Sequence, residues 1–290
     1  MKAILSIVLL LLAVTDSPSE TGVPAVNSQP IGMKGTNGGA SRAVRVARPL
    51  SRGNHDARMD ALRQFKTIQN ADGSWAENEV RQLSTAFALI SFLRCGESDD
   101  SPEFGKTMKK AQNWLLSSKP QTDSERIATA VALSDWVTVH YRWHHKQAMI
   151  PSTQIRKIKE CVDGVSPRCS EIWKDLLAVS RLPDEVVRKQ DDATVRTPTE
   201  KYLDREFPAV LLSIDDYVLL FLCTHAHFSH GGRKWEVWEP NLRPMYRFQR
   251  ANSFFPCKAE ADRIAVTGSC IMSLAVYYIT SSHFFANFAD

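Results

Sequence analysis

Two pairs of adjacent carboxylates are the first residues in this sequence whose type and spacing could perform chemistry. They are Asp191-Asp192 and Asp215-Asp216. A carboxyl group beside a carboxylate holds its proton to higher pH, and that proton can be delivered to a substrate in general acid catalysis. Adjacent acids are also common in the first turn of a helix, where they accept hydrogen bonds from free backbone N–H groups. Asp192, Asp215 and Asp216 are therefore the candidate catalytic acids, with helix capping as the alternative.

A stripe of one cysteine and two histidines could hold a metal ion. Cys223, His227 and His230 are spaced i, i+4 and i+7, so on a helix they share one face. His140 and His144 form a second i, i+4 pair. The pattern matches no common zinc-binding spacing, and packed or solvent-facing histidines are the alternative. The sequence indicates no cofactor other than a metal ion at this stripe.

A short polar turn joins two stretches of helical periodicity. Residues 69–75 read QNADGSW, and apolar residues recur at helical spacing before and after them. Asp72-Gly73 supplies the positive φ of a tight turn, and Trp75 is large enough to fill the layer between two helices. Gln69, Asp72, Gly73 and Trp75 are thus expected to have structural roles.

The same pattern returns later in the chain. The sequence positions that match, 180 residues apart, are Leu62-Arg63 with Leu242-Arg243, Gln69 with Gln249, Asp72 with Asn252, and Trp75 with Phe255. Such self-similarity predicts an internal repeat, with Gln249 in a second, degenerate turn.

The segment from Leu62 to Leu116 resembles the α/α-toroid repeat of terpene cyclases and prenyltransferases. It is most similar to exported bacterial prenyltransferase/squalene-oxidase repeat proteins of the squalene-hopene cyclase type. A Gln…Asp-Gly-Ser-Trp turn precedes a helix that begins near Thr85-Ala86, and residues 96–105 and 231–249 match the family's later segments. The resemblance covers residues 60–145 and 216–278. It implies an all-α fold, an α/α toroid of helical hairpins around a barrel.

Residues 183–207 depart from that family pattern. They are charged and contain few large apolar side chains, which predicts a long connection where the family has further helices. The toroid is therefore expected to be incomplete or eroded.

The resemblance also implies two chemistries, and the sequence lacks the motif of each. Cyclases of this class use Asp-x-Asp-Asp, whereas residues 213–216 read SIDD and lack the first acid. Protein prenyltransferases bind zinc through Asp, Cys and His, and no such set is evident. We therefore expect a binding or structural module for an apolar ligand or a protein partner. An isoprenoid-handling enzyme with an atypical acid and a metal-binding module are the alternatives.

The composition and the amino-terminal residues limit which other classes of function are possible. The net charge of +4 is small for 290 residues, and the basic residues are scattered outside 42–58, which argues against a nucleic-acid surface. Lys2 followed by an apolar run over residues 3–14 predicts a signal peptide, because the run is too short for a stable membrane anchor. We expect a signal peptide at 1–18, a disordered leader at 19–55, and one toroid domain at 56–290. The mature protein is then periplasmic or extracellular.

Six cysteines form an even set, which an exported protein could pair. Cys161 and Cys169 flank a short turn and are the favoured local disulfide, with buried free thiols as the alternative. Periodicity predicts helices and no strands, with Gly96 ending the second helix. The expected helices are 56–70, 80–94, 103–118, 124–147, 152–162, 168–180, 210–229, 240–250 and 262–282.

Overall fold

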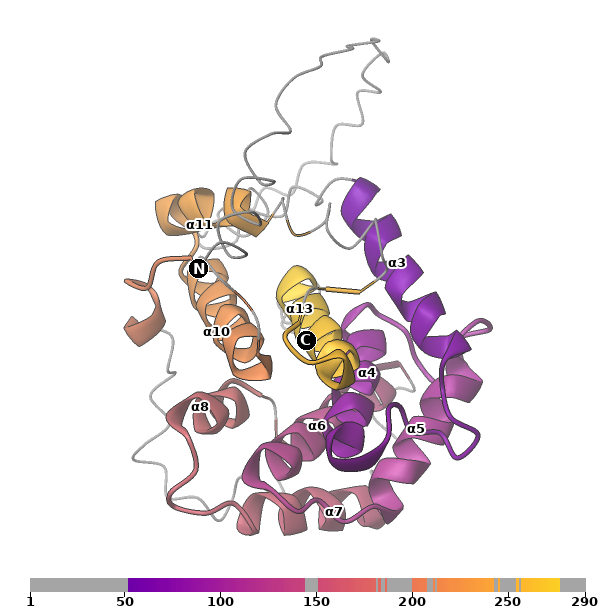
Figure 1. The fold of residues 1–290 in the computed structure, drawn as a ribbon. Coiled ribbons are helices and arrows are strands. Elements are labelled where there is room, and N and C mark those ends of the chain that lie inside the picture. Colours follow the sequence, from indigo (N-terminus) through magenta and orange to yellow (C-terminus); the bar gives the residue numbers. More distant parts are fainter. Residues whose placement is uncertain are drawn as a thin grey trace, which may run out of the picture. The chain divides into compact units, whose positions relative to one another are not determined.

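The structure is a computed structural model, and it is all-α in the part of the chain that it describes. The described residues are 52–143, 151–180, 182–183, 186, 200–207, 211, 213–242, 245, 254–255 and 257–276. They all belong to the second of two compact units, residues 38–290. Helices and short 3₁₀ turns account for the regular structure of these residues, which contain no strand (Figure 1). Among them, no helix combines the length and apolar character needed to cross a bilayer.

The described helices and turns are as follows, in chain order. The α-helices are α3 (Arg52–Thr67), α4 (Arg81–Arg94), α5 (Gly105–Ser117), α6 (Asp123–Trp143), α7 (Ser152–Asp163), α8 (Glu171–Val179), α10 (Ile214–His230), α11 (Gly232–Trp238) and α13 (Arg263–Leu274). The 3₁₀ turns are η1 (Asn78–Val80), η2 (Glu200–Tyr202), η3 (Glu239–Leu242) and η4 (Glu260–Asp262). Most expected helices are found within a few residues of their expected bounds.

The expected helix at 240–250 is the exception. Its first residues form η3, and the preceding segment, expected to be a loop, forms α11. Gly231 and Gly232 both have positive φ, 67° and 55°, which ends α10 and lets the chain start a new helix in another direction. Most residues from 243 to 250 lie outside the described part of the chain.

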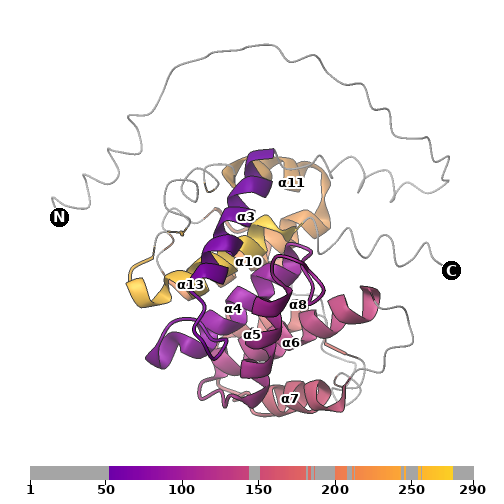
Figure 2. The same ribbon diagram turned by 90° about the vertical axis from the view of Figure 1, so that its right-hand side faces the viewer.

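Five helices contact one another in a closed order, which we call the five-helix ring. α4 packs against α6, α6 against α8, α8 against α10, α10 against α13, and α13 against α4 (Figures 1 and 2). The other helices pack outside this sequence of contacts: α3 on α13 and α4, α5 on α4 and α6, α7 on α6, and α11 on α10. Ring helices therefore alternate with outer helices over most of the chain.

Burial explains why the two sets of helices differ in composition. From Ser84 to Arg94 every residue of α4 is buried, as is every residue of α13 from Ile264 to Leu274. A helix that is buried on all sides is expected to carry apolar or small side chains on every face. By contrast, α5 buries one stripe, including Met108, and leaves its lysines exposed.

α4 and α13 approach closely because of one glycine. A Cβ atom on Gly268 would lie 2.7 Å from the carbonyl oxygen of Phe87. At the same crossing the Ser91 hydroxyl lies 2.7 Å from the Phe87 carbonyl and 3.3 Å from that of Gly268. Helix backbones can come this near only where a side chain is missing.

Gly96 ends α4 as the sequence predicts. Its φ is 89°, its N–H donates to the Leu93 carbonyl, and the Glu97 N–H donates to the Phe92 carbonyl, both at 3.1 Å. This pair of bonds is a Schellman motif, which satisfies carbonyls left open at a helix end.

The expected Cys161–Cys169 disulfide is not formed. All six cysteines carry free thiols. Cys161 and Cys169 are each buried in the hydrophobic core, so packing accounts for both. Burial raises the pKa of the Cys161 thiol to about 11, which disfavours the thiolate needed for disulfide exchange.

Candidate functional site

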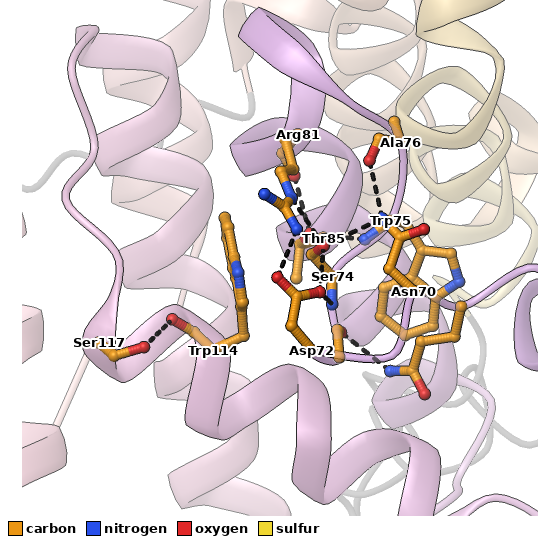
Figure 3. A network of polar contacts seen from close by, with 11 residues as sticks. Asn70, Asp72, Ser74, Trp75, Ala76, Arg81, Thr85, Trp114 and Ser117 are labelled. Carbon is orange, nitrogen blue, oxygen red and sulfur yellow. Dashed lines mark hydrogen bonds and ion pairs between the residues drawn. The ribbon is translucent and has the colours of Figure 1, made fainter.

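The turn between α3 and α4 is built around Trp75. Its side chain is fully buried, and its indole N–H donates to the Phe65 carbonyl at 2.7 Å. Its backbone N–H donates to the Thr85 hydroxyl at 3.0 Å, which ties the turn to the first turns of α4 (Figure 3). Gln69 donates from its amide nitrogen to the carbonyls of Gly73 and Thr107, each at 2.9 Å. These contacts join α3, α4 and α5.

Asp72 organises the exposed side of the same turn (Figure 3). One carboxylate oxygen accepts from the Ser74 N–H at 3.1 Å and from its hydroxyl at 2.8 Å, and the other pairs with Arg81. Arg81 in turn lies over the Trp114 ring, 5.4 Å from its centroid. Burial alone would raise the pKa of Asp72, but the hydrogen bonds from Ser74 and the charge of Arg81 outweigh it, and the pKa is lowered. The carboxylate therefore has a complete structural role.

The second copy of the turn repeats one contact of the first. The backbone N–H of Phe255 donates to the Thr267 hydroxyl at 3.0 Å, as Trp75 does to Thr85. Phe255 is buried, and Thr267 lies in the first turns of α13. The sequence comparison at a fixed offset of 180 residues does not match Thr267 with Thr85. The reason is that the spacing from the aromatic residue to the threonine differs by two residues between the two copies. Gln249 and Asn252 lie outside the described residues.

The candidate acids at the start of α10 hold the helix in place. Asp216 and Ser213 form a capping box: the Asp216 carboxylate accepts from the Ser213 N–H at 2.8 Å, and the Ser213 hydroxyl accepts from the Asp216 N–H at 3.3 Å. Asp215 accepts from the indole N–H of Trp173 at 2.8 Å, which links α10 to α8. Asp192 lies outside the described residues.

The cysteine–histidine stripe on α10 does not form a metal-binding group. No three His, Cys, Asp or Glu side chains converge on a common point in the described part of the chain. His227 is buried and stacks on Trp238, whereas His230 is exposed at the helix end. Burial raises the pKa of the Cys223 thiol to about 11, and the thiolate is the form that binds metal. The side chains of His140 and His144 lie outside the described residues.

A part-buried ion pair joins α4 to α6. Arg94 at the end of α4 donates from Nε to Asp135 of α6 at 2.7 Å. Its guanidinium also lies over the ring of Phe221 on α10, 4.9 Å from the centroid. The Arg94 side chain is only 6% exposed, so Arg94 joins three ring helices from within.

Several buried polar atoms near the ring's interior have no hydrogen-bond partner among the described residues. All of them belong to ring helices: Ser84, Arg94 Nη1, Ser134, both His227 ring nitrogens, Ser269 and Ser273. An unpaired buried polar group costs roughly 1–3 kcal/mol, and native structures hold few of them. The ring thus carries polar groups that packing alone does not explain.

A second buried carboxylate anchors the segment before α10. Asp175 of α8 accepts a hydrogen bond from the Tyr202 hydroxyl and lies 2.5 Å from the Lys201 ammonium. Burial and the neighbouring Asp175 raise the pKa of Tyr202, so the phenol stays protonated and keeps donating. The contact fixes η2 on α8.

No protein-family model, curated protein or solved structure matches this chain. The resemblance to the toroid superfamily therefore depends on the turn, its second copy and the order of helices.

Proposed function

We propose that this chain is an exported binding module on an α/α toroid of the terpene cyclase/prenyltransferase type, one that lacks the catalytic acid of such enzymes. Two observations support the toroid: the closed order of contacts in the five-helix ring, and the outer helices that alternate with it. The Trp75–Thr85 contact and its counterpart at Phe255 and Thr267 support a repeated hairpin.

One observation carries the non-catalytic part of the proposal. Asp215 and Asp216, the described candidate acids, are engaged by Trp173 and by the Ser213 cap. Protonation of an alkene needs a carboxyl group that faces the substrate in a dry cavity, with neighbours that keep it protonated. Turning Asp216 toward a substrate would break the capping box of α10. A carboxylate that closes a helix end has little freedom to act as an acid.

The proposed ligand is an apolar molecule or a protein partner. Aromatic side chains meet across the five-helix ring, because Phe87 of α4 lies 6.1 Å from Trp173 of α8 between ring centroids. The ring helices also carry Arg94 and several serines whose buried polar atoms have no partner among the described residues. Apolar surroundings with a few polar groups suit an apolar ligand or a protein partner.

The test compares the purified protein with variants at the start of α10. We expect no cyclised or transferred product from squalene or farnesyl diphosphate with the wild-type chain. Asp215→Asn and Asp216→Asn should change thermal stability only modestly, since each amide oxygen can still accept a hydrogen bond. Ser213→Ala is the matched control, because it removes the cap while keeping both acids, and should cost about 1 kcal/mol.

Product formed by the wild-type chain and lost in either Asn variant would overturn the proposal. It would place an active site at the amino-terminal end of α10. The alternative hypothesis of an isoprenoid-handling enzyme with an atypical acid would then hold.

A further inference from the structure

His227, near the end of α10, is buried without a hydrogen-bond partner. It is 6% exposed, and neither ring nitrogen is bonded to any described residue. Its imidazole lies flat on the indole of Trp238, with ring centroids 4.3 Å apart and planes 11° apart. Trp238 is fixed by its own N–H, which donates to the Thr224 hydroxyl at 3.0 Å. The stack therefore fastens α11 to α10.

The segment at 200–207 also contacts Trp238. Phe207 packs on Trp238 with ring centroids 5.3 Å apart, and the exposed Lys234 of α11 pairs with the exposed Asp204 at 3.0 Å. Exposed ion pairs contribute little stability.

Each of these two elements has a second attachment. Residues 200–207 are also held on α8 by the bond from Tyr202 to Asp175. On α11, Trp235 is buried and packs edge-on to Phe228 of α10, with ring centroids 5.1 Å apart. The His227–Trp238 stack is therefore one of two aromatic contacts that hold α11 on α10.

The charges around His227 do not favour a positive ring. Lys234 of α11 and His230 of α10 repel it, whereas Asp204 attracts it but already pairs with Lys234. From α8, Asp175 is engaged by Tyr202 and Lys201. From α13, the titratable and charged groups are the buried thiol of Cys270 and Arg263, whose guanidinium lies over the ring of Phe254.

We propose that the His227–Trp238 stack is an acid-operated latch: protonation of His227 opens the stack and loosens α11 from α10. A protonated imidazole has two N–H donors. The Lys234 backbone lies near enough to favour the protonated ring, but neither nitrogen has a well-formed hydrogen bond to a described residue. Attraction to the indole face replaces only part of the hydration that these two donors lose. Opening the stack returns them to water.

The direction of the pKa shift agrees with this geometry. Burial lowers the pKa of His227 below its ordinary value of 6.5. The Lys234 backbone and the charge of Asp204 oppose this shift, whereas the charges of Lys234 and His230 add to it, and the pKa remains lowered. The unfolded or released state then binds the proton more readily than the latched state. The stabilising contribution is fully present above the pKa of His227 in the open state, and it is lost as the pH falls from that value through the lower pKa of the stacked state.

The experiment is hydrogen–deuterium exchange by mass spectrometry on the whole chain at about pH 5 and about pH 7.5, on either side of the histidine range. Rates are corrected for the intrinsic pH dependence of exchange. We expect protection of residues 232–238 to be several-fold lower at pH 5 than at pH 7.5, because the proton binds more readily to the open state than to the closed stack. Protection of α13 should persist, because the proposed opening is local.

Two variants and one titration make the test decisive. His227→Phe keeps an aromatic ring on Trp238 but cannot be protonated, so its protection of residues 232–238 should not change with pH. His230→Gln, an exposed histidine on the same helix, should behave as wild type. Equal wild-type protection at both pH values, acid loss retained in His227→Phe, or loss of α13 protection together with α11 would each overturn the proposal. An NMR titration of wild-type His227 with a pKa at or above 6.5 would overturn it independently.

Discussion

Trp75 combines complete burial with two hydrogen bonds, one from its indole and one from its backbone. Trp75→Ala should lower the free energy of unfolding by about 3–5 kcal/mol, the usual cost of truncating a large buried aromatic residue. Trp75→Phe should cost less, because the ring remains and chiefly the bond to the Phe65 carbonyl is lost. Thermal or urea unfolding followed by circular dichroism measures both. A midpoint unchanged in Trp75→Ala would contradict its place in the core.

Two glycines with positive φ offer a matched comparison. Gly73 and Gly96 have φ of 96° and 89°, but a Cβ atom on Gly73 would lie 2.5 Å from the Lys110 carbonyl, and one on Gly96 would meet nothing within 4 Å. Gly96→Ala should cost about 1–2 kcal/mol for the left-handed backbone alone. Gly73→Ala should cost a further ~1–3 kcal/mol from the clash. Equal losses in urea unfolding would mean that the turn does not pack on α5.

At the scale of elements, Gly268 sets the distance between α4 and α13. Gly268→Ala places a methyl group 2.7 Å from the Phe87 carbonyl and should destabilise the fold by about 1–3 kcal/mol. Ser269→Ala, the next residue of the same helix, is the control. It removes a buried hydroxyl that has no partner in the described structure, so it should be neutral or slightly stabilising. Calorimetry that found the two variants equally destabilised would argue against the close crossing.

Local signals in the sequence predicted most helices, since amphipathic spacing and glycine ends act over a few residues. The cap at Gly96 and the turn at Trp75 belong to this class. The predicted helix bounds were wrong after α10, where Gly231 and Gly232 allow an additional helix, α11. Sequence reasoning could not find Arg94 and Asp135, because they lie 41 residues apart and meet only when α4 and α6 pack. Helical spacing also could not decide the metal-binding hypothesis. It places Cys223, His227 and His230 along one helix face but does not show whether their ligand atoms meet, and no group of three such ligands forms among the described residues.

At the scale of the whole molecule, export is the prediction that concerns the chain before α3. Lys2 and the apolar run over residues 3–14 motivate it, and these residues lie outside the described structure. Mass spectrometry of the protein from its native host should find a mature start between about Ser17 and Val26, as signal-peptide cleavage requires. An intact Met1 on cytosolic protein would rule export out.

Because α4 packs against α13, the domain cannot complete its fold until nearly the whole chain has been synthesised. Ser91 and Gly268, which meet at this crossing, are 177 residues apart in sequence. A domain whose central helices are joined over such a separation has few local routes to its native state, and contacts of this kind slow folding. During synthesis, α4 is made long before the helix that covers it, so its apolar surface must stay exposed or be held by a chaperone until α13 emerges. The order of synthesis, rather than the strength of any single contact, then determines when this chain is most prone to aggregate.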